Sequence, residues 1–222
     1  MINAQHPHSN LPLDLCIVHQ SSQWVVADKP AGLLCVPGRG PDKADCLVAR
    51  VQAQFPSALT VHRLDMATSG LVVFGLGAAM QRQLSISFAE RQVHKRYEAV
   101  VTGWVDRDAG AINLPLSADW PNRPRQRVNA EHGKPSCTHW QVLTRDETTF
   151  TTRLALAPIT GRSHQLRVHL AAIGHAILGD ALYAEPSVAG AAPRLLLHAC
   201  GLAFDALPGV SGPLQFQSLT PF

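Results

Sequence analysis

A carboxylate stands among cationic side chains in one polar stretch of the chain, His62-Arg63-Leu64-Asp65-Met66-Ala67-Thr68-Ser69-Gly70. An aspartate close to cations stays ionised, which suits a nucleophile or a general base. The stretch leads directly into an apolar run over 71–76, so Asp65 is expected at the rim of the core. An aspartate that precedes Thr-Ser-Gly is also a common turn or capping residue. These residues alone leave both roles open for Asp65.

A second polar group, Arg162, His164 and Arg167, lies within the segment 159–170. Two interpretations remain open for it. The side chains form an ordinary solvated surface, or one arginine is the ion partner that orients a catalytic carboxylate. A zinc site is not favoured, because His164 and His169 are five residues apart and that spacing does not place two ligands on one helical face.

A helix over 163–173 is predicted to carry this second group. Apolar side chains recur there at helical spacing, namely Leu166, Leu170 and Ile173, and they are expected to face the core. Arg167 and His164 are then expected on the polar face of the helix. Thr160 or Ser163 is the expected cap, and Gly174 is the expected end of the helix.

Four cations cluster in a proline-containing segment that follows Asp119, namely Arg123, Arg125, Arg127 and Lys134. Two prolines exclude a regular helix, so we expect an exposed and fairly stiff arm. A charged loop is often only solvated. However, arginines next to Trp120 and to side-chain amides are also suited to binding a phosphate backbone and stacking on bases.

A basic run over 91–98 contains Tyr97, one of only two tyrosines in the chain. The pattern predicts a strand over 91–105, with Tyr97, Ala99 and Val101 on one face. A tyrosine on such a strand is most simply a core aromatic with its hydroxyl at the edge.

The remaining pattern predicts the α+β class with a largely antiparallel sheet. Apolar runs bounded by turn residues predict strands over 24–27, 71–76, 111–116, 138–144, 150–157 and 194–204, and helices over 45–55 and 78–90. Strands outnumber helices and do not alternate with them regularly. Because no repeat or long linker divides the chain, we expect a single domain over 1–222, with 1–12 as a flexible arm.

The composition is that of a packed globular protein. The 222 residues are 46% hydrophobic and 16% charged, which excludes disordered and coiled-coil classes. No run approaches the ~18 apolar residues of a membrane helix, and the first ten residues lack a signal-peptide pattern. Five cysteines, an odd number at wide spacing, indicate unpaired thiols in a reducing compartment. A cytoplasmic protein without membrane association is expected.

The basic residues are 15 Arg against 4 Lys, although the net charge is only +3. Arginine forks onto phosphate and stacks on bases, so the excess favours an RNA partner. High-GC codon usage would produce the same excess.

Together, five separated motifs resemble the RluA-type family of RNA pseudouridine synthases. In order, the matching pieces are KPAGLLCVPGRG (29–40), HRLDMATSGLVV (62–73), KRYEAVV (95–101), GRSHQLRVHLAAIGHAILGDALY (161–183) and RLLLHA (194–199). They extend over most of the chain from about residue 24 to residue 200. The GRSH form replaces a GRTH form found in many relatives, and both forms keep a hydroxyl. The stretches DWPNRPRQRV and GKP resemble the short dual-specificity type of this family.

This resemblance implies the pseudouridine synthase catalytic fold, a mixed and mostly antiparallel sheet with flanking helices and a central RNA-binding cleft. The chain has no room for the S4 RNA-binding domain that many relatives carry. The reaction is an isomerisation without net redox change or hydrolysis, so the resemblance implies no cofactor and no metal.

The resemblance also implies roles for individual residues. Asp65 is the aspartate that attacks the target uridine, at the base or at the ribose carbon. Tyr97 stacks on the base and helps to remove the C5 proton, and Arg167 pairs with the aspartate. Arg63 enters the RNA where the uridine is flipped out of its stack. Further RNA contacts are expected from a set of basic side chains, namely His62, Arg123, Arg125, Arg127, Arg162 and His164.

The implied partner is structured RNA bound by a monomer, with a hairpin of 23S ribosomal RNA and the anticodon stem-loop of transfer RNA as substrates. Two functions other than RNA isomerisation remain to be distinguished. A non-catalytic RNA-binding or ribosome-assembly protein on the same fold would bind RNA without isomerising it. A carboxylate-based hydrolase would need a second acid near Asp65, and the sequence offers no convincing one.

Overall fold

The computed structural model describes residues 15–40, 43–205, 207 and 212–222. The arm expected over 1–12 lies outside the described residues. Within them, no helix is long and apolar enough to cross a membrane. All five cysteines are free thiols, as predicted.

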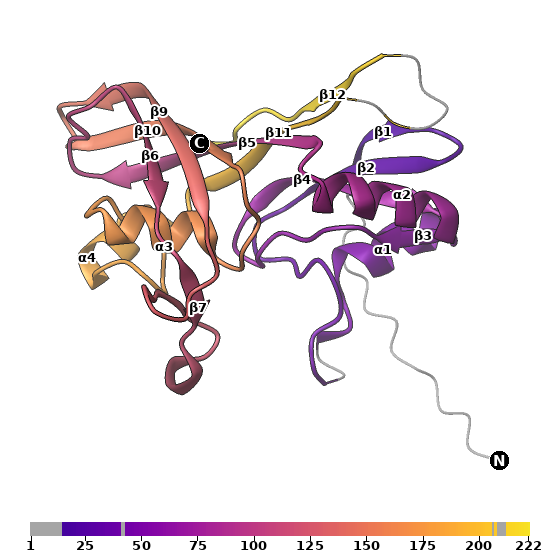
Figure 1. Cartoon of the computed structure of the whole chain (residues 1–222), viewed down its shortest axis with the longest axis horizontal. Helices are drawn as coiled ribbons and strands as arrows, with labels where there is room; N and C mark the ends of the chain where they lie inside the picture. The colour runs from indigo at the N-terminus through magenta and orange to yellow at the C-terminus, as the bar shows by residue number, and fades with distance from the viewer. Residues whose placement is uncertain (1–14, 41–42, 206, 208–211) are drawn as a thin grey trace.

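One large mixed sheet runs through the molecule (Figure 1). Its strands are β1 (Cys16–Gln20), β2 (Trp24–Lys29), β3 (Ala58–Thr60), β4 (Ser69–Leu76), β5 (Val93–Thr102), β6 (Ala109–Asn113), β9 (Cys137–Asp146), β10 (Thr151–Pro158), β11 (Leu197–Phe204) and β12 (Leu214–Gln217). They follow the order β1-β2-β4-β11-β5-β10-β9-β6, with β3 beside β4 and β12 beside β11. Only β4 and β11 pair in parallel, so the predicted α+β class with a mostly antiparallel sheet is confirmed.

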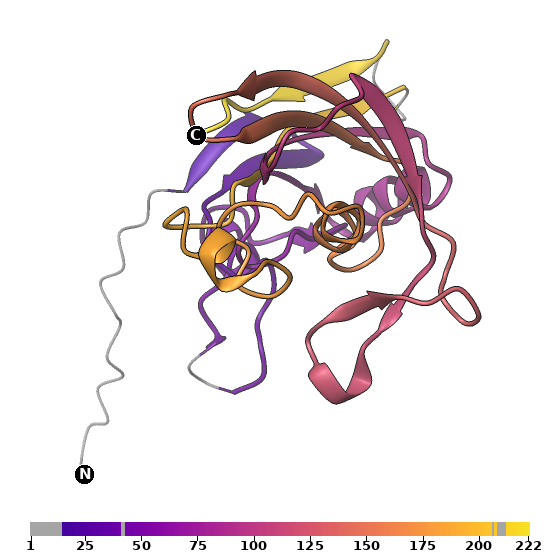
Figure 2. The same ribbon diagram turned by 90° about the vertical axis from the view of Figure 1, so that its left-hand side faces the viewer.

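The helices are few and short. They are α1 (Leu47–Gln54), α2 (Ala78–Ala89), α3 (Gln165–Ala172), α4 (Pro186–Ala189) and the 3-10 turn η2 (Trp120–Asn122). A separate two-stranded sheet, β7 (Leu116–Ala118) with β8 (Gln126–Val128), forms a hairpin. Figure 2 shows this hairpin extending away from the large sheet, on the side where α3 and α4 lie.

The core is divided into three apolar clusters that meet at the centre of the sheet. Residues such as Val25 and Val72 pack with α1, whereas their neighbours Val26 and Val73 pack with α2. Both faces of β2 and β4 are therefore covered, which explains their continuous apolar sequences. A third cluster joins β5 and β10 to α3. Tyr97 on β5 contacts both the first and the third cluster.

Two predicted elements differ from the structure. The strand expected over 111–116 is divided between β6 and β7, with Pro115 between them. The proline has no N–H to continue a ladder, so pairing changes partner at this point. The arm expected near Arg123 to Arg127 is the β7–β8 hairpin, in which β8 pairs with β7.

The helix predicted over 163–173 forms as α3, but its cap and the burial of its polar face differ from the prediction. The helix begins at Gln165, and its first flanking residue is His164 with φ 54°, not a capping Thr160 or Ser163. Its expected polar face is buried, since Arg167 is only 5% exposed, whereas the expected core residue Ile173 is 38% exposed. The apolar spacing predicts the wrong exposed face because the polar side chains of α3 form hydrogen bonds inside the protein.

Candidate active site

A cavity of about 530 Å³ opens between the segment around Asp65, strand β5 and the start of α3. It brings together six of the residues expected to act on RNA, namely His62, Arg63, Asp65, Tyr97, Arg162 and His164. Arg167 lies beside Asp65 without lining the cavity. The hairpin residues Arg123, Arg125 and Arg127 do not line it.

The segment that carries Asp65 is fixed at both ends. The Thr68 N–H donates to the Asp65 carbonyl at 3.1 Å, which closes a turn. The Met66 carbonyl accepts from the Gly32 N–H at 2.8 Å and from Lys29 Nζ at 3.0 Å. Burial lowers the pKa of Lys29 to about 8, so its ammonium remains charged at neutral pH. The turn around Gly32 therefore holds the Asp65 segment in place.

Gly70 allows this segment to enter the sheet. Its φ is +117°, and a Cβ at this position would lie 2.4 Å from the Ala199 carbonyl oxygen of β11. Only glycine fits both the backbone conformation and the close approach. The parallel contact between β4 and β11 thus begins directly after the Asp65 turn.

The Asp65 carboxylate has charge beside it but no hydrogen-bond donor among the described residues. Arg167 Nη1 lies 3.7 Å from Oδ2, and His164 Nε2 lies 3.8 Å from Oδ1. Burial is the main cause that lowers the pKa of His164, so Arg167 is the charged neighbour at neutral pH. A carboxylate with a cation at this distance and with its lone pairs free is suited to nucleophilic attack.

Arg167 has its main partner elsewhere. Its Nε and Nη2 donate to the two oxygens of Asp180 at 2.8 and 2.6 Å, and Asp180 is 1% exposed. Burial opposes the charge of Arg167, but the Asp180 hydrogen bonds and negative charge raise its pKa overall. The bidentate pair uses one edge of the guanidinium and leaves Nη1 directed at Asp65. Sequence analysis missed Asp180, although it lies in the GDALY portion of a quoted motif.

Tyr97 and His62 are both neutral at physiological pH. Burial, followed by the nearby Asp65 charge, raises the pKa of Tyr97 well above its usual value. Burial lowers the pKa of His62 to about 3. Its Nε2 accepts a hydrogen bond from the Val73 N–H at 3.1 Å, and its ring stacks on Phe88 at 4.5 Å. His62 therefore forms a fixed wall of the cavity.

Cations surround the opening of the cavity. Arg63 and Arg162 are exposed there, as the sequence predicts for RNA contacts, and Arg91 and Lys95 join them. Burial, and then the charge of Arg91, lower the pKa of Lys95. The structure pairs none of these four cations with an acid among the described residues. Lys95 was missed, although strand alternation places it on the same face as Tyr97.

The hairpin presents a separate basic surface. Arg123, Arg125 and Arg127 are exposed, and the Arg123 guanidinium lies 4.4 Å from the ring centroid of Trp120, itself 67% exposed. β8 lies against α3, so the hairpin is attached close to the element that carries Arg167.

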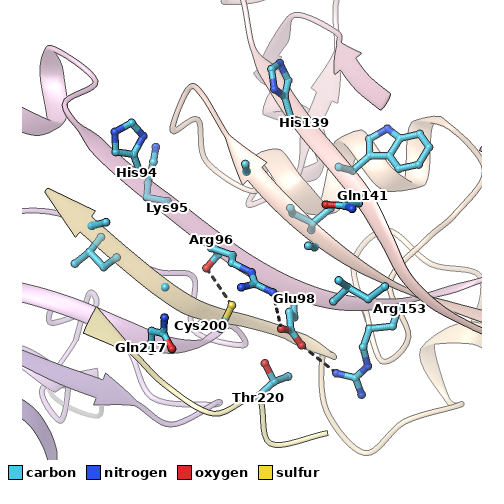
Figure 3. Close-up of a pocket in the computed structure, with 18 of the residues that line it drawn as sticks. His94, Lys95, Arg96, Glu98, His139, Gln141, Arg153, Cys200, Gln217 and Thr220 are labelled. Carbon is cyan, nitrogen blue, oxygen red and sulfur yellow. Dashed lines mark hydrogen bonds and ion pairs between the residues drawn. The ribbon is translucent and has the colours of Figure 1, made fainter. Parts of the chain in front are cut away.

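A larger cavity, about 1330 Å³, lies on the other face of β5 (Figure 3). Of its β5 residues, His94, Arg96 and Glu98 alternate with Tyr97 and so point away from Asp65, whereas Lys95 borders both cavities. Glu98 lies 3.6 Å from Arg96 and 3.3 Å from Arg153. Glu98 therefore partly neutralises Arg96 and Arg153, as the dashed lines in Figure 3 show.

Neither cavity offers a metal site. Within the described residues, no three His, Cys, Asp or Glu side chains gather closely enough to hold a metal ion. The groups that the smaller cavity presents are one carboxylate, one tyrosine and the cations around them.

Comparison with known proteins decides the family. The family model described as RNA pseudouridylate synthase matches residues 23–172. The chain belongs to this family. It is therefore an RNA pseudouridine synthase, an isomerase that modifies RNA.

Relatives of this synthase cover nearly the whole chain. The "Dual-specificity RNA pseudouridine synthase RluA" of Yersinia pestis is 48% identical over 208 residues, which are 94% of this chain and 100% of that protein. The protein of the same name from Escherichia coli (strain K12) is 50% identical over 94% of each chain. The RluA-type resemblance inferred from the motifs is thus confirmed.

Solved structures confirm the fold of the synthase. Human RNA Pseudouridylate Synthase Domain Containing 1 has a TM-score of 0.79 at 28% identity, covering 95% of this chain and 85% of that one. Human RNA Pseudouridylate Synthase Domain Containing 4 has a TM-score of 0.74 at 26% identity, covering 93% and 88%.

Proposed function

We propose that this pseudouridine synthase acts through Asp65 as its nucleophile, with Tyr97 and Arg167 as the other two residues of the catalytic centre. One observation carries the proposal. Asp65 is the carboxylate of the smaller cavity, and it combines a cation at 3.7 Å with lone pairs that no described donor occupies. A charged group held without hydrogen bonds is prepared to bond to a substrate.

The reaction balances without a cofactor. Asp65 attacks the target uridine, at the base or at the ribose C1′, and the glycosidic bond between C1′ and N1 breaks. The uracil turns and C5 bonds to C1′, which releases the carboxylate. C5 loses its proton to solvent and N1 gains one, so product and substrate are isomers. If Asp65 has added to the base and not to C1′, the carboxylate leaves the ring as C5 loses its proton.

Tyr97 is proposed to stack on the base during this rotation. The raised pKa of its hydroxyl supports a neutral phenol in the resting enzyme. It can therefore assist removal of the C5 proton only by accepting a hydrogen bond or by passing its own proton on. Arg167, fixed by Asp180, supplies a positive charge 3.7 Å from the Asp65 carboxylate.

RNA is proposed to bind across the cavity and the hairpin. The target base must leave its stack to reach Asp65, and Arg63 at the opening is placed to enter the space it leaves. Arg162 and His164 would contact the RNA at the cavity, with His62 as its wall, while Arg123, Arg125 and Arg127 would bind phosphates from the hairpin.

The proposed substrates are two structured RNAs. The names of the Yersinia and Escherichia relatives include dual specificity. We extend this to the present chain, with a hairpin of 23S ribosomal RNA and the anticodon stem-loop of transfer RNA as targets. Loops of this kind expose unstacked bases. The enzyme is proposed to act as a single-domain monomer in the cytoplasm.

Tritium release tests the proposal. Transcripts of 23S ribosomal RNA and of transfer RNA, labelled with tritium at uridine C5, are incubated with the protein without added metal or nucleotide. Release from both is expected. Asp65→Asn should lower release by about a thousandfold or more while RNA affinity stays within about twofold.

Two outcomes would redirect the proposal. Near-normal release by Asp65→Asn would reject the nucleophile. Tight binding of both transcripts without release by the parent protein would reject these substrates. If no other RNA released tritium, that result would favour the non-catalytic RNA-binding alternative.

A further inference from the structure

Tyr183, the second tyrosine of the chain, connects the hairpin to the catalytic centre through its hydroxyl. The Gln126 N–H of β8 donates to Tyr183 Oη at 2.8 Å. On the other side, His164 Nδ1 lies 2.6 Å from the same oxygen. His164 Nε2 then faces Asp65 Oδ1 at 3.8 Å. Two hydrogen bonds and one approach of 3.8 Å thus lead from the hairpin backbone to Asp65.

The hydrogen-bond directions along this path can be worked out from donor and acceptor capacity. Tyr183 Oη accepts from the Gln126 N–H, which leaves its own proton to be donated. Within the described residues, His164 Nδ1 is the one acceptor bonded to this hydroxyl. We assign the hydrogen bond in this direction, which leaves Nδ1 as its acceptor and places the proton of a neutral imidazole on Nε2. That N–H points towards the carboxylate of Asp65.

His164 is held in a conformation that its backbone disfavours. Its φ of 54° lies in the left-handed region, which costs free energy for a residue with a side chain. The carbonyl of His164 still accepts the Val168 N–H at 3.0 Å, so the strained residue also begins α3. The imidazole lies between Tyr183 and Asp65.

We propose that Tyr183 and His164 are positioning residues that couple RNA docking on the β7–β8 hairpin to the orientation of the Asp65 carboxylate. When phosphates engage Arg125 and Arg127, the intervening Gln126 N–H moves with them. Tyr183 and His164 transmit that movement to Asp65. The inference rests on the proposed roles of Asp65 and of the hairpin, and it explains how the enzyme would respond to a correctly docked RNA.

Tyr183→Phe removes the hydroxyl and keeps the ring against Arg167, whose guanidinium lies 5.1 Å from its centroid. With a transfer RNA anticodon stem-loop as the probe, the single-turnover rate of tritium release should fall about tenfold, and the dissociation constant should change by less than about twofold. This separation of rate from affinity is the mark of a positioning role.

A matched control removes a comparable hydroxyl away from both cavities. Thr152 Oγ1 also bridges a donor and an acceptor, since it accepts the Val105 N–H at 3.2 Å and donates to the Gly103 carbonyl at 2.8 Å. Thr152→Val should lower the melting temperature without changing the rate. An equal loss of rate in both variants would mean that Tyr183 acts through stability alone.

A double-mutant cycle tests the coupling itself. The variant Arg125→Ala/Arg127→Ala should lower the rate at saturating RNA in the parent protein but add little in the Tyr183→Phe background. Fully additive effects would overturn the proposal, and so would a hairpin variant that changes neither binding nor rate. A fully active Asp65→Asn would instead reject the nucleophile, so the two failures are distinguishable.

Fluorine NMR gives a readout that a merely structural role would not change. The chain has two tyrosines, so 3-fluorotyrosine labelling yields two signals, and Tyr183→Phe identifies one of them. Binding of the stem-loop should shift both. In the hairpin variant, the Tyr97 signal should still shift while the Tyr183 signal stays in place. A Tyr183 signal that responds equally without the hairpin arginines would reject the coupling.

Discussion

The two cavities on opposite faces of β5 differ in how their charges are used. The larger one, about 1330 Å³, holds Glu98 between Arg96 and Arg153, so its charges largely satisfy one another. The smaller one, about 530 Å³, holds Asp65 with no hydrogen-bond donor among the described residues and is surrounded by cations that lack an acidic partner there. What distinguishes the smaller cavity, which we propose as the active site, is therefore charge that remains available to a substrate. Cavity volume would have pointed to the larger one.

The ion pair next to the smaller cavity also differs from the ion pair that lines the larger one. Asp180 and Arg167 are almost completely buried and are joined by two short hydrogen bonds. Glu98 and Arg153 are partly exposed, with a single contact of 3.3 Å. Buried pairs are costly to break because one charge is left without a partner, whereas exposed pairs contribute little. We therefore expect the first pair to fix the proposed catalytic residues and the second to be dispensable.

Breaking the buried pair should produce the larger effect on stability. Asp180→Asn is expected to lower the free energy of unfolding by about 3–5 kcal/mol, because Arg167 loses its bidentate partner in the interior. The freed guanidinium should also turn towards Asp65 and hydrogen-bond to it, which lowers the rate of tritium release. Urea denaturation and single-turnover kinetics measure the two effects.

The matching variant on the other face is Glu98→Gln. It should cost less than about 1 kcal/mol and leave tritium release unchanged. Comparable destabilisation by the two variants would contradict the contrast between the two ion pairs. An Asp180→Asn protein that is unstable but fully active would show that Arg167 does not need Asp180 to support Asp65.

Sequence reasoning found the strands that obey simple periodicity and missed what depends on distant partners. β4 was predicted from its apolar run, since both of its faces are covered. β3 and β8 have three residues each, too few for a recognisable alternation. On α3, Gln165 and His169 appear solvent-facing by pattern, but both bond to Thr138 of β9. Only the fold shows that such polar side chains are satisfied internally.

The proposed catalytic residues also show what sequence reasoning could find and what it missed. The family motifs pointed to Asp65, Tyr97 and Arg167, and the fold brings these residues together. The sequence could not show that Arg167 divides its guanidinium between Asp180 and Asp65, because no local spacing reports a contact between α3 and the segment that follows it. Residues that act through others were therefore missed.

The buried His62 should make the free energy of unfolding depend on pH. The folded pKa of His62 is about 3 because it is buried, below the unfolded value of 6.5. As pH falls below 6.5 the unfolded chain binds a proton that the folded protein does not, so stability decreases. Between pH 7 and pH 5 this group alone lowers the free energy of unfolding by about 2 kcal/mol.

His62→Asn keeps an acceptor for the Val73 N–H and removes the titration. The loss of stability between pH 7 and pH 5, measured by urea denaturation, should shrink by up to about 2 kcal/mol. Burial also lowers the pKa of His169 and His198, so part of the slope remains. An unaltered slope in His62→Asn would contradict the buried, neutral state of this wall.

The smallest expected effect distinguishes the cations of the two cavities as RNA contacts. Lys95 borders both cavities, but its Nζ lies beside Gly161 of the smaller one and has no acidic partner among the described residues, whereas Arg153 is held by Glu98 in the larger one. Lys95→Gln should weaken binding of a transfer RNA stem-loop by about tenfold or less and reduce the slope of log K against log salt by about 1, because one phosphate contact is lost. Arg153→Gln should change neither quantity. A reduced salt slope in Arg153→Gln would place RNA on the larger cavity as well, and the contrast between available and neutralised charge would then fail to separate the two faces.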